Sequence, residues 1–570
     1  MSSRAVRIIT EVAAVDRPFD YALDDATGPV ALGDRVRVDF NHRSVRGWVV
    51  DGAVATADLK TVKKWLGFGP PATMLDLLRW ASERWYGTWS RFLLSASPTR
   101  IVSELPLAPK PVPLAASLRD SAWRVAPGVI QLAPTTDPLA LVLGAYEATR
   151  ERAGSLLVLV PNERWAVRLR GRLEQRGCAV ASGEEQWDRA RAGWPVVVGA
   201  RGTALAPVPH VAGAVVIDAD DESYRSSAAP TWEAVAVLRE RCRREGAPLW
   251  CTSIIPSPAL LDDGDFVKSE DFVAAWPRVE VVDRRQSDPH EGVLSPSALA
   301  AAHRALEGDE KVAVVVILQR LGTGRLLACS SCGELARCAL CQQAEEEVGE
   351  QLACSERHEV RARFCRQCGS TKLKRLRVGV ATLARDVAAQ IGQPVSEVTA
   401  SLDPSSALAR VAVGTEATWQ RVRRSGVVIF VDFDQYLLAP RESARRAAIN
   451  AVGKAARLVG SRREGRGHVV LQTRRGDDVV VRALELARFD EIIAEDVATA
   501  RLLGLSPYGA SAEVSGAGAE AFIESLRDVA GVSVEETSSG YLVRASNPTS
   551  LTDALRRVER PAQKFRVAVQ

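Results

Sequence analysis

Seven of the ten cysteines of this chain lie between residues 329 and 368, and no other feature constrains the fold as strongly. They are Cys329, Cys332, Cys338, Cys341, Cys354, Cys365 and Cys368. Six of them form three C-x-x-C pairs, a spacing in which the chain bends back and offers two thiolates to one tetrahedral ion. Gly333 and Gly369 each follow the second cysteine of a pair, where such a bend needs a permissive backbone. The sequence therefore predicts a zinc knuckle.

The number of zinc ions is less constrained than their presence. Two pairs complete one four-cysteine site, and the third pair then has Cys354 and needs a fourth ligand. His358 is the nearest candidate, in a C-x3-H spacing, and its alternative role is that of a solvated surface residue. We expect one zinc ion and leave a second open. Neither site has an obvious open position or an adjacent general base, so zinc here is expected to be structural.

The charges around the cysteines differ in sign along the chain. Acidic residues come first, at Glu345, Glu346, Glu347 and Glu350. Basic residues follow, at Arg361, Arg363, Arg366, Lys372, Lys374, Arg375 and Arg377. A basic face on a zinc knuckle suits a phosphate backbone, and the alternative is a solvated charged face. We take Arg361, Arg363, Lys372 and Lys374 as candidate DNA contacts.

The whole chain is not a polycation. Its 570 residues carry a net charge of +4, so any nucleic-acid site must be a local patch. This length favours about three or four domains. No apolar run of about 18 residues exists, and the first residues lack a signal-peptide pattern. We therefore expect a cytoplasmic protein without membrane contact.

The hydrophobic pattern predicts a multidomain α/β protein. Short apolar segments with turns predict a β-rich domain over residues 1–104, and closely spaced prolines predict an extended linker over 105–127. Buried strands then alternate with helices, which predicts parallel sheets. The expected strands are Leu156–Val160, Val196–Val198, Ala214–Ile217, Val312–Ile317, Val427–Val431 and Val469–Gln472. A small α+β domain is expected to close the chain over residues 481–570.

The order of these features resembles the PriA family of replication-restart helicases. Arg17-Pro-Phe-Asp-Tyr21, Gly33-Asp-Arg-Val-Arg-Val38 and Arg46-Gly-Trp-Val-Val50 resemble that family's domain for a DNA 3′ end. The resemblance implies two helicase-like lobes, over 128–270 and over 271–324 with 378–480, and a paired-zinc insertion over 325–377. It also implies that the first and last C-x-x-C pairs share one zinc, while Cys338, Cys341 and Cys354 serve the other. Arg357 stands where the family has a further cysteine.

The resemblance also implies a pocket for the DNA 3′ end, made by Phe19, Asp20 and Lys60. An aromatic face stacks on a terminal base, a carboxylate accepts the 3′-hydroxyl proton, and a lysine meets a phosphate. Phe19 has an alternative role as a core aromatic. Asp39-Phe40-Asn41 replaces the family's usual Pro-Phe-Gly, so the edge of the pocket is expected to differ.

The motor residues of the family are eroded. No G-x-x-x-x-G-K-[ST] string occurs, and Ala133-Pro-Thr-Thr-Asp-Pro138 stands in its expected place. Asp218-Ala-Asp-Asp-Glu222 replaces the acidic box, and Cys251-Thr-Ser-Ile-Ile-Pro256 the coupling motif. Asn450-Ala-Val-Gly-Lys-Ala-Ala-Arg457 replaces the arginine-finger helix. Phosphoryl transfer depends on charge positioned around the phosphates, so we expect a helicase-like scaffold without ATPase activity.

These patterns favour a DNA-binding replication-restart protein that recognises forked or 3′-ended DNA. Its expected partners are DNA and primosome proteins, including a replicative helicase. One alternative is an active ATP-dependent 3′-to-5′ DNA helicase, or a protein that binds ATP without hydrolysing it. Another alternative is a zinc-stabilised scaffold that binds proteins only, and salt-sensitive DNA affinity would argue against it.

Overall fold

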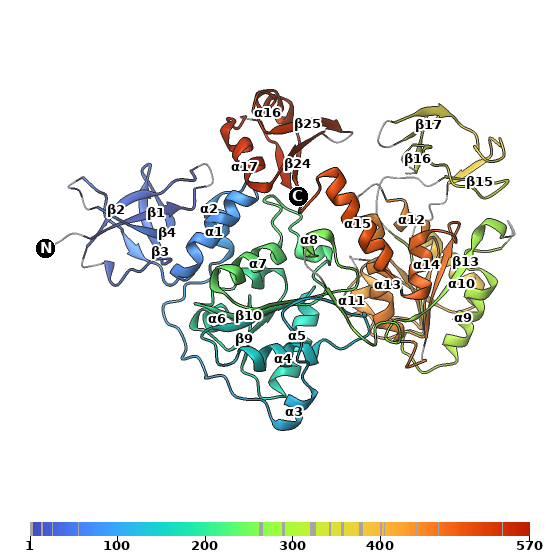
Figure 1. Ribbon diagram of the computed structural model, residues 1–570, viewed down its shortest axis with the longest axis horizontal. Helices are drawn as coiled ribbons and strands as arrows, with labels where there is room; N and C mark the ends of the chain where they lie inside the picture. Colours follow the sequence, from blue (N-terminus) through green and yellow to red (C-terminus); the bar gives the residue numbers. More distant parts are fainter. Residues whose placement is uncertain are drawn as a thin grey trace.

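The computed structural model describes residues 4–570, apart from a set of short gaps. These gaps are residues 13–14, 25–26, 55, 57, 262–265, 288–290, 320–326, 341–343, 355–357, 376–379, 400–401, 404, 440–442, 466, 538–539 and 562. The described chain is a multidomain α/β protein with two parallel sheets in its middle and antiparallel sheets towards both ends, as the sequence predicts (Figure 1). No helix in these ranges is both long and apolar enough to cross a membrane.

The N-terminal part is an antiparallel sheet in the order β2-β1-β4-β3-β5. Its strands are β1 (Arg4–Thr10), β2 (Phe19–Leu23), β3 (Arg35–Phe40), β4 (Arg43–Ala53) and β5 (Lys64–Trp65). Asn41 and His42, with φ of 45° and 61°, form the turn between β3 and β4. Helices α1 (Ala72–Arg84) and α2 (Trp89–Ser95) pack on the side of Ile9 and Trp48. Residues 101–115 then form no helix or strand, and α3 (Ala116–Ser121) follows.

Lobe 1 is a parallel sheet in the order β12-β6-β11-β10-β7-β9-β8. Its strands are β6 (Gly128–Gln131), β7 (Ser155–Leu159), β8 (Val180–Ser182), β9 (Val196–Gly199), β10 (Val211–Val216), β11 (Leu249–Ser253) and β12 (Phe266–Lys268). Its helices are α4 (Leu139–Thr149), α5 (Glu163–Glu174), α6 (Trp187–Ala192), α7 (Ala234–Glu245) and α8 (Pro258–Leu261). The central strands are buried throughout, which is why they read as continuous apolar runs.

Lobe 2 is a second parallel sheet, in the order β13-β23-β22-β14-β21-β20. Its strands are β13 (Arg278–Asp283), β14 (Val314–Ile317), β20 (Val395–Val398), β21 (Val411–Gly414), β22 (Val427–Phe430) and β23 (His468–Thr473). Its helices are α9 (Pro296–Leu306), α10 (Val380–Ile391), α11 (Thr418–Arg421), α12 (Asp434–Leu437), α13 (Ala444–Val459), α14 (Val479–Leu486) and α15 (Asp490–Leu503). Phe489 and Ile492 belong to its core, so lobe 2 extends past residue 480, where the sequence suggested its end.

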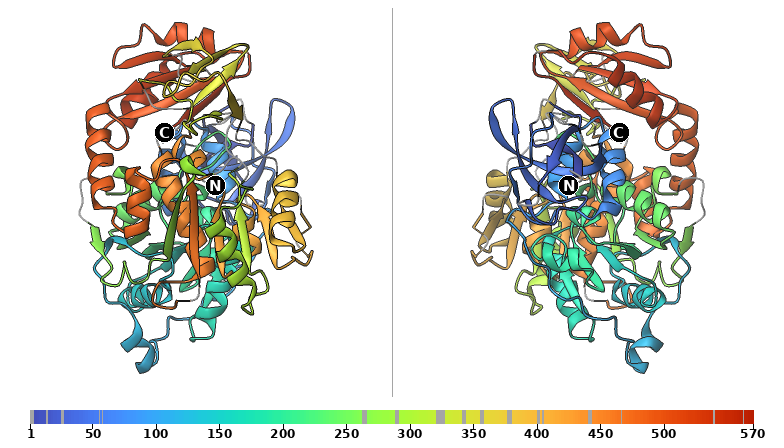
Figure 2. Two further views of the ribbon diagram at one scale, coloured as in Figure 1. Left: turned by 90° about the vertical axis from the view of Figure 1, so that its right-hand side faces the viewer. Right: turned by 90° about the vertical axis from the view of Figure 1, so that its left-hand side faces the viewer.

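The cysteine-rich insertion lies between β14 and α10 and forms two small antiparallel sheets. The strands are β15 (Leu327–Cys329), β16 (Glu345–Val348), β17 (Gln351–Cys354), β18 (Val360–Ala362) and β19 (Leu373–Arg375). β15 pairs with β19, and β16, β17 and β18 form the second sheet. The insertion and the C-terminal domain lie at the same end of the molecule, above the two lobes (Figures 1 and 2).

The C-terminal domain is the predicted small α+β unit. Its antiparallel sheet, in the order β25-β26-β24-β27, carries two helices. The elements are β24 (Ala510–Ser515), α16 (Ala519–Leu526), β25 (Val532–Thr537), β26 (Gly540–Ala545), α17 (Pro548–Arg557) and β27 (Arg566–Val569). Arg556 donates to the carbonyls of Ser82 and Gly87 at the end of α1, at 3.0 and 3.2 Å. Thr231 of lobe 1 donates to the Val569 carbonyl at 2.9 Å. The domain thus ties the N-terminal part to lobe 1.

Candidate metal centres and nucleic-acid interface

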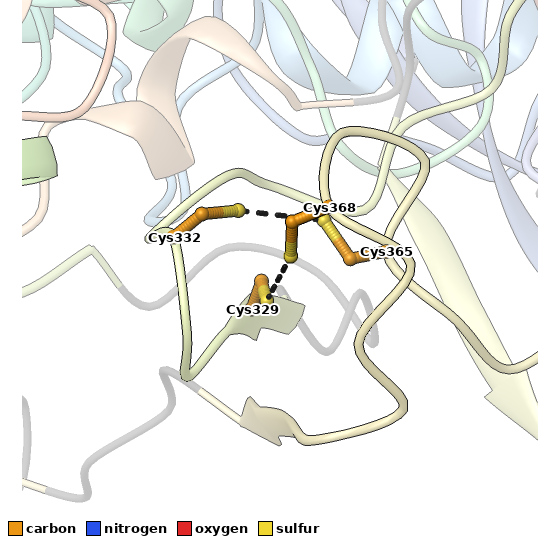
Figure 3. Close-up of side chains that lie close together, drawn as sticks. All are labelled: Cys329, Cys332, Cys365 and Cys368. Carbon is orange, nitrogen blue, oxygen red and sulfur yellow. Dashed lines mark hydrogen bonds between the residues drawn. The ribbon is translucent and has the colours of Figure 1, made fainter.

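Four cysteines from the two ends of the insertion converge on one point. Cys329 and Cys332 come from the end of β15 and the following turn, and Cys365 and Cys368 come from the turn before β19. The Cys329–Cys368 and Cys332–Cys365 sulfur pairs are each 3.5 Å apart, and all four sulfur atoms lie within 4.8 Å of one another (Figure 3). Four sulfurs around zinc at about 2.3 Å would be about 3.8 Å apart, so the spacing fits one tetrahedral ion.

Two equivalent backbone turns hold this cluster. The amide of Gly333 donates to the Cys329 carbonyl and that of Gly369 to the Cys365 carbonyl, each at 2.9 Å. The two glycines have φ of 75° and 72°, which a residue with a Cβ rarely adopts. Burial raises the pKa of the Cys329 thiol, but hydrogen bonds from the Cys332 and Ser331 amides outweigh burial and lower this pKa to about 6. Burial raises the pKa of the Cys332 thiol to about 12 and also raises that of Cys365, so Cys329 is the thiol of this cluster that the protein itself holds as a thiolate, the form that binds metal.

A second group of possible ligands lies in the other sheet of the insertion. Cys338, Cys354 and His358 place one ligand atom each within 4.8 Å of the others, and Cys354 Sγ is 3.8 Å from His358 Nδ1. The exposed ring of His358 therefore turns toward the two buried thiols, which its alternative role as a solvated residue does not require. Cys341, expected to be a ligand here, lies outside the described residues. The six described cysteines of the insertion divide between the two groups in the way that the family resemblance implies.

Two of the basic residues of the insertion pair with its acidic residues. Arg361 on β18 pairs with Glu345 on β16, with Arg361 Nε and Glu345 Oε1 2.8 Å apart, and the side chains are only 10% and 0% exposed. Arg363 Nε lies 2.6 Å from Glu347 Oε1, and the same guanidinium donates to the Thr371 and Leu373 carbonyls at 2.9 Å.

For Arg361 and Arg363 the expected division into an acidic and a basic side is wrong, because strand pairing brings them next to Glu345 and Glu347. Of the four candidate DNA contacts in the insertion, Lys372 and Lys374 are exposed. Arg361 and Arg363 instead support the fold of the insertion.

The three residues expected at the DNA 3′-end pocket lie on or beside β2. Phe19 is half-buried and meets Phe40 edge to face at 4.9 Å between ring centroids, and the Arg17 guanidinium lies 5.0 Å from its ring. Asp20 is exposed, with Arg7 Nε 3.4 Å from its carboxylate. The Lys60 carbonyl accepts from the Ala22 amide at 3.0 Å, so Lys60 runs beside the same strand.

An open cavity of about 700 Å³ adjoins this strand. Asp24, Asp39, His42, Lys60 and Lys63 line it, and Lys63 Nζ is 2.7 Å from Asp39 Oδ1. Asp39 therefore occupies a cavity-lining position in the segment that departs from the family's Pro-Phe-Gly. The sequence did not single out Asp24 or Lys63, which line this cavity, or Arg17, which lies against the Phe19 ring.

The eroded motor segments of the two lobes bind each other. Lys454 on α13 of lobe 2 places Nζ 3.1 Å from Asp221 Oδ2 of lobe 1. Arg457 on the same helix pairs with Asp218, donates to the Pro134 carbonyl at 3.2 Å, and lies 4.9 Å from the Trp165 ring centroid. The cations of the altered arginine-finger helix thus neutralise the altered acidic box.

Close packing of α13 against lobe 1 accompanies these ion pairs. A Cβ on Gly453 would lie 2.3 Å from Ile254 Cδ1, so a larger residue here would force the end of the Ile254 side chain to move. The cavity between Asp218, Asp221, Lys454 and Arg457 measures about 10 Å³. A small-molecule site usually has roughly 300–1,000 Å³. The segment 133–138 has no glycine or lysine to hold phosphates, and its Asp137 pairs with Arg172, with Nη1 and Oδ1 2.9 Å apart.

Burial and charge perturb the groups at this interface. Burial raises the pKa of Asp218, and Arg457 only partly opposes that effect. The pKa of Asp221 is lowered, because Lys454 and hydrogen bonds from Ser223 outweigh its burial. Burial lowers the pKa of Lys454, but Asp221 outweighs burial and raises it overall. The Lys454–Asp221 pair is therefore ionised at neutral pH.

A larger cavity of about 450 Å³ lies on the other side of Lys454, where the N-terminal part, both lobes and the C-terminal domain meet. Its lining mixes cations such as Arg84 and Arg446 with acids such as Glu233 and Glu416. This mixture does not resemble the uniformly positive cradle that nucleotide phosphates require.

The comparisons with known proteins agree with the N-terminal geometry. A family model described as PriA 3'DNA-binding domain (3'BD) matches residues 7–98. The chain is 22% identical over 354 residues to the replication restart protein PriA of Thermotoga maritima, a match that covers 57% of this chain and 46% of that protein. It is 22% identical over 358 residues to PriA of Haemophilus influenzae, covering 56% and 47%. The matched stretch is thus about half the length of these curated relatives.

Solved structures with a similar arrangement include Saccharomyces cerevisiae Dbp5 bound to RNA and ADP BeF3. It is 10% identical, with a TM-score of 0.35, covering 68% of this chain and 94% of that one. Dbp5 L327V bound to Nup159, Gle1 H337R, IP6 and ADP is 10% identical, with a TM-score of 0.31 over 66% and 87%. Scores this low carry no argument, and the parallel sheets of the two lobes define the fold by themselves.

Proposed function

Because the chain belongs to the PriA family of replication restart proteins, we propose that it recognises forked or 3′-ended DNA and acts without hydrolysing ATP. The match of residues 7–98 to a 3′ DNA-binding domain is the observation that carries this proposal. According to this proposal, the protein acts in the cytoplasm, where it binds DNA at stalled forks and recruits primosome proteins, including a replicative helicase.

The 3′ end binds in the N-terminal domain. Phe19 is half-buried, so part of its ring is accessible to stack on a terminal base. Asp20 is exposed beside Arg7 and accepts the proton of a 3′-hydroxyl. Lys60 contributes a charge to the adjoining open cavity and meets the last phosphate. A 3′-phosphate would face Asp20 as a like charge, so this geometry selects a free hydroxyl.

The zinc-binding insertion supplies a second contact with DNA. Cys329, Cys332, Cys365 and Cys368 would hold one zinc ion, and Cys338, Cys354 and His358, with Cys341, would hold another. Zinc there supplies structural cross-links between strands that bury little apolar surface. The exposed Lys372 and Lys374 then meet phosphates. The insertion and the N-terminal domain lie at opposite ends of the long axis of the molecule (Figure 1). A branched DNA substrate that contacts both therefore has to extend along the molecule.

The interlobe contact supports the proposed lack of ATP hydrolysis. Lys454 and Arg457 occupy the carboxylates that would otherwise hold magnesium in a family motor, and no lysine of a P-loop is present. The helicase-like lobes then serve as a rigid platform between the two DNA-binding ends.

The proposal is tested by fluorescence-anisotropy titration of fork DNA with a 3′-hydroxyl or a 3′-phosphate on the leading strand, beside a phosphate-release assay with ATP. We expect tight, salt-sensitive binding, at least about tenfold tighter for the 3′-hydroxyl, and no DNA-stimulated phosphate release. Asp20→Asn should narrow that preference, while Asp51→Asn, another exposed partner of Arg7, should leave it unchanged. Equal affinity for the 3′-hydroxyl and the 3′-phosphate would overturn the proposed recognition of the 3′ end. DNA-stimulated phosphate release would overturn the proposed lack of ATP hydrolysis.

A further inference from the structure

The connection between the N-terminal part and lobe 1 contains a strongly exposed stretch of chain. Residues Leu105–Pro113, here called the proline segment, read Leu-Pro-Leu-Ala-Pro-Lys-Pro-Val-Pro and form no helix, strand or turn. In Figure 1 the segment belongs to the trace that runs from α2 to α3 along the outside of the molecule. The Leu107 side chain is 95% exposed and that of Val112 is 59% exposed, so both are accessible to a partner.

The composition of the segment restricts its backbone conformation. The rings of Pro106, Pro109, Pro111 and Pro113 hold φ at about −65°. Each ring also excludes the helical region for the residue before it, which is pushed toward an extended conformation. Among the nine residues of the segment, only Leu107 is neither a proline nor followed by one. The segment is therefore restricted to polyproline II, a left-handed helix without internal hydrogen bonds.

Both ends of the segment are held by the protein, whereas its middle is not. Before the segment, Val102 is buried, and its carbonyl accepts an amide hydrogen bond from the N-terminal part at 2.8 Å. At the other end, the Tyr146 hydroxyl donates to the Val112 carbonyl at 2.7 Å, and Leu114 is buried in the core of lobe 1. Within the part of the chain that the structure describes, residues 103–111 form no hydrogen bond and no ion pair.

A connecting role alone does not require this sequence. The N-terminal part contacts lobe 1 directly, because Trp187 Nε1 donates to the Ala96 carbonyl at 2.9 Å. Arg191 Nε also donates to the Gly69 carbonyl, at 3.1 Å. Since these contacts join the two parts, the connection between them needs no stiffness of its own, and a flexible chain rich in glycine and serine would serve equally well. The segment instead combines stiffness with accessible apolar side chains.

The segment presents two of its three edges to solvent. Polyproline II has three residues per turn, so residues three apart share an edge. Leu105 and Ala108 share the edge that the protein partly covers. The exposed residues of the other two edges are Pro106, Pro109 and Val112 on one, and Leu107, Lys110 and Pro113 on the other.

We propose that the proline segment is a docking site for a partner protein that binds polyproline II in a groove lined by aromatic side chains. Aromatic rings pack against proline rings, and the restricted backbone spares the complex most of the cost of ordering a flexible peptide. Lys110 is the only charged residue of the segment, so the groove carries an acidic side chain at its rim. This inference goes beyond the proposed function, because it assigns a protein contact that does not depend on DNA.

The first test titrates the full chain with three purified probes that bind polyproline II, namely an SH3, a WW and an EVH1 domain. We expect at least one of them to bind the wild type at concentrations up to about 100 μM, and to bind P106A/P109A at least about tenfold more weakly. The double variant loses two rings and regains backbone freedom. K110E should also weaken binding, because it opposes an acidic rim. Pro29→Ala, at an exposed proline outside the segment, should bind like the wild type.

The second test identifies the partner in cells that make the protein. The substitution Leu107→p-benzoylphenylalanine places a photo-crosslinker on an exposed edge of the segment, and mass spectrometry identifies the crosslinked protein. That protein, once purified, should bind the wild-type chain at least about tenfold more tightly than P106A/P109A. The same substitution at Leu502, which is 84% exposed at the end of α15, serves as the control. Crosslinking from position 107 that is no stronger than from position 502 would overturn the proposal.

The remaining outcomes also decide the question. If none of the three domains binds, or if P106A/P109A binds as tightly as the wild type, the segment is not a docking site. Self-association of the wild type that P106A/P109A abolishes in analytical ultracentrifugation would make a second copy of this chain the occupant. A fork-DNA affinity lowered by P106A/P109A would make the segment part of the DNA interface. Loss of domain binding with unchanged fork-DNA affinity and an unchanged melting curve supports the proposal, whether or not the proposed DNA recognition holds.

Discussion

Lys454 Nζ lies 3.1 Å from Asp221 Oδ2, so a lysine in the long helix of lobe 2 neutralises a carboxylate of lobe 1. In an ATP-driven motor, this interface opens and closes around a nucleotide, with charges on both sides directed at phosphates and magnesium. Here the charges are directed at each other. The contact explains how a helicase-like pair of lobes keeps a defined arrangement after losing its motor residues.

Removing Lys454 should destabilise the arrangement of the lobes. Breaking a fully buried ion pair costs about 3–5 kcal/mol, and because the Lys454 side chain is 31% exposed we expect a cost of about 2–3 kcal/mol for Lys454→Ala. Differential scanning calorimetry should show a lower Tm. Lys63→Ala is a matched control, since the Lys63–Asp39 pair is 48% and 39% exposed and should contribute less than about 1 kcal/mol. An equal effect of both substitutions would contradict a special role for the interlobe pair.

Nucleotides should leave the protein unaffected. A ligand at 100 times its Kd stabilises the folded state by about 2.7 kcal/mol, which a melting curve detects easily. Because the cleft between Asp218 and Lys454 measures only about 10 Å³, we expect millimolar ATP with magnesium to leave Tm unchanged. A clear upward shift would mean that the lobes open to admit nucleotide, and would reopen the question of a motor.

The sequence predicted the elements whose signals are local. The apolar runs at Leu156–Val160 and Val427–Val431 are the strands Ser155–Leu159 and Val427–Phe430, because a strand buried on both faces is apolar at every position. The glycines after the first and third C-x-x-C pairs likewise marked the turns of the four-cysteine cluster correctly. In both cases the information lies within a few residues of chain.

The interactions that the sequence did not reveal join distant residues. Arg361 pairs with Glu345 because β16, β17 and β18 form one antiparallel sheet, and charge runs along the chain do not show which strands pair. Arg457 reaches Asp218 from the other lobe. Phe19 and Asp20 are neighbours on β2, so their side chains leave opposite faces of the sheet. A pocket that contains both, as the family resemblance implies, would therefore have to form at the edge of this strand.

Replacing Arg361 should unfold part of the insertion and not merely weaken DNA binding. Arg361→Ala leaves the Glu345 carboxylate, which is 0% exposed, with only the more distant Arg366, whose Nη2 lies 3.9 Å from Glu345 Oε1, and breaking a buried ion pair costs about 3–5 kcal/mol. We expect loss of amide protection in β16–β18 by hydrogen exchange. Lys372→Ala, at an exposed position of the same insertion, should preserve protection and lower DNA affinity. If Arg361→Ala instead preserved amide protection and lowered DNA affinity, Arg361 would be a direct DNA contact.

Zinc content should divide between the two cysteine groups. Purified protein is expected to hold about two zinc ions per chain, since two groups of ligand atoms each lie within 4.8 Å. Cys329→Ser and Cys354→Ser should each remove about one ion, measured by plasma mass spectrometry. His358→Ala should weaken retention of only the second ion in a chelator titration. If Cys354→Ser leaves the zinc content unchanged, the second group holds no metal.

A half-buried aspartate after β22 should make stability depend on pH. Burial, with the nearby Asp434 carboxylate, raises the pKa of Asp432 to about 7. Asp432 Oδ2 accepts from Gln435 Nε2 at 3.0 Å, while its other oxygen is buried without a hydrogen bond. The folded state therefore retains a proton that the unfolded chain releases near pH 4, and this contribution to stability is lost as the pH rises from about 4 to about 7.

The substitution Asp432→Asn removes the ionisable group and keeps the shape of the carboxylate. It therefore removes that pH dependence. The difference in Tm between the variant and the wild type should grow in favour of the variant from about pH 4 to about pH 7 and stay constant above. Melting curves across this range measure it. Asp271→Asn, whose carboxylate is 63% exposed and pairs with Arg463, serves as a control and should show no such trend. Parallel profiles for wild type and Asp432→Asn would mean that the Asp432 carboxylate is already ionised in the folded protein at low pH.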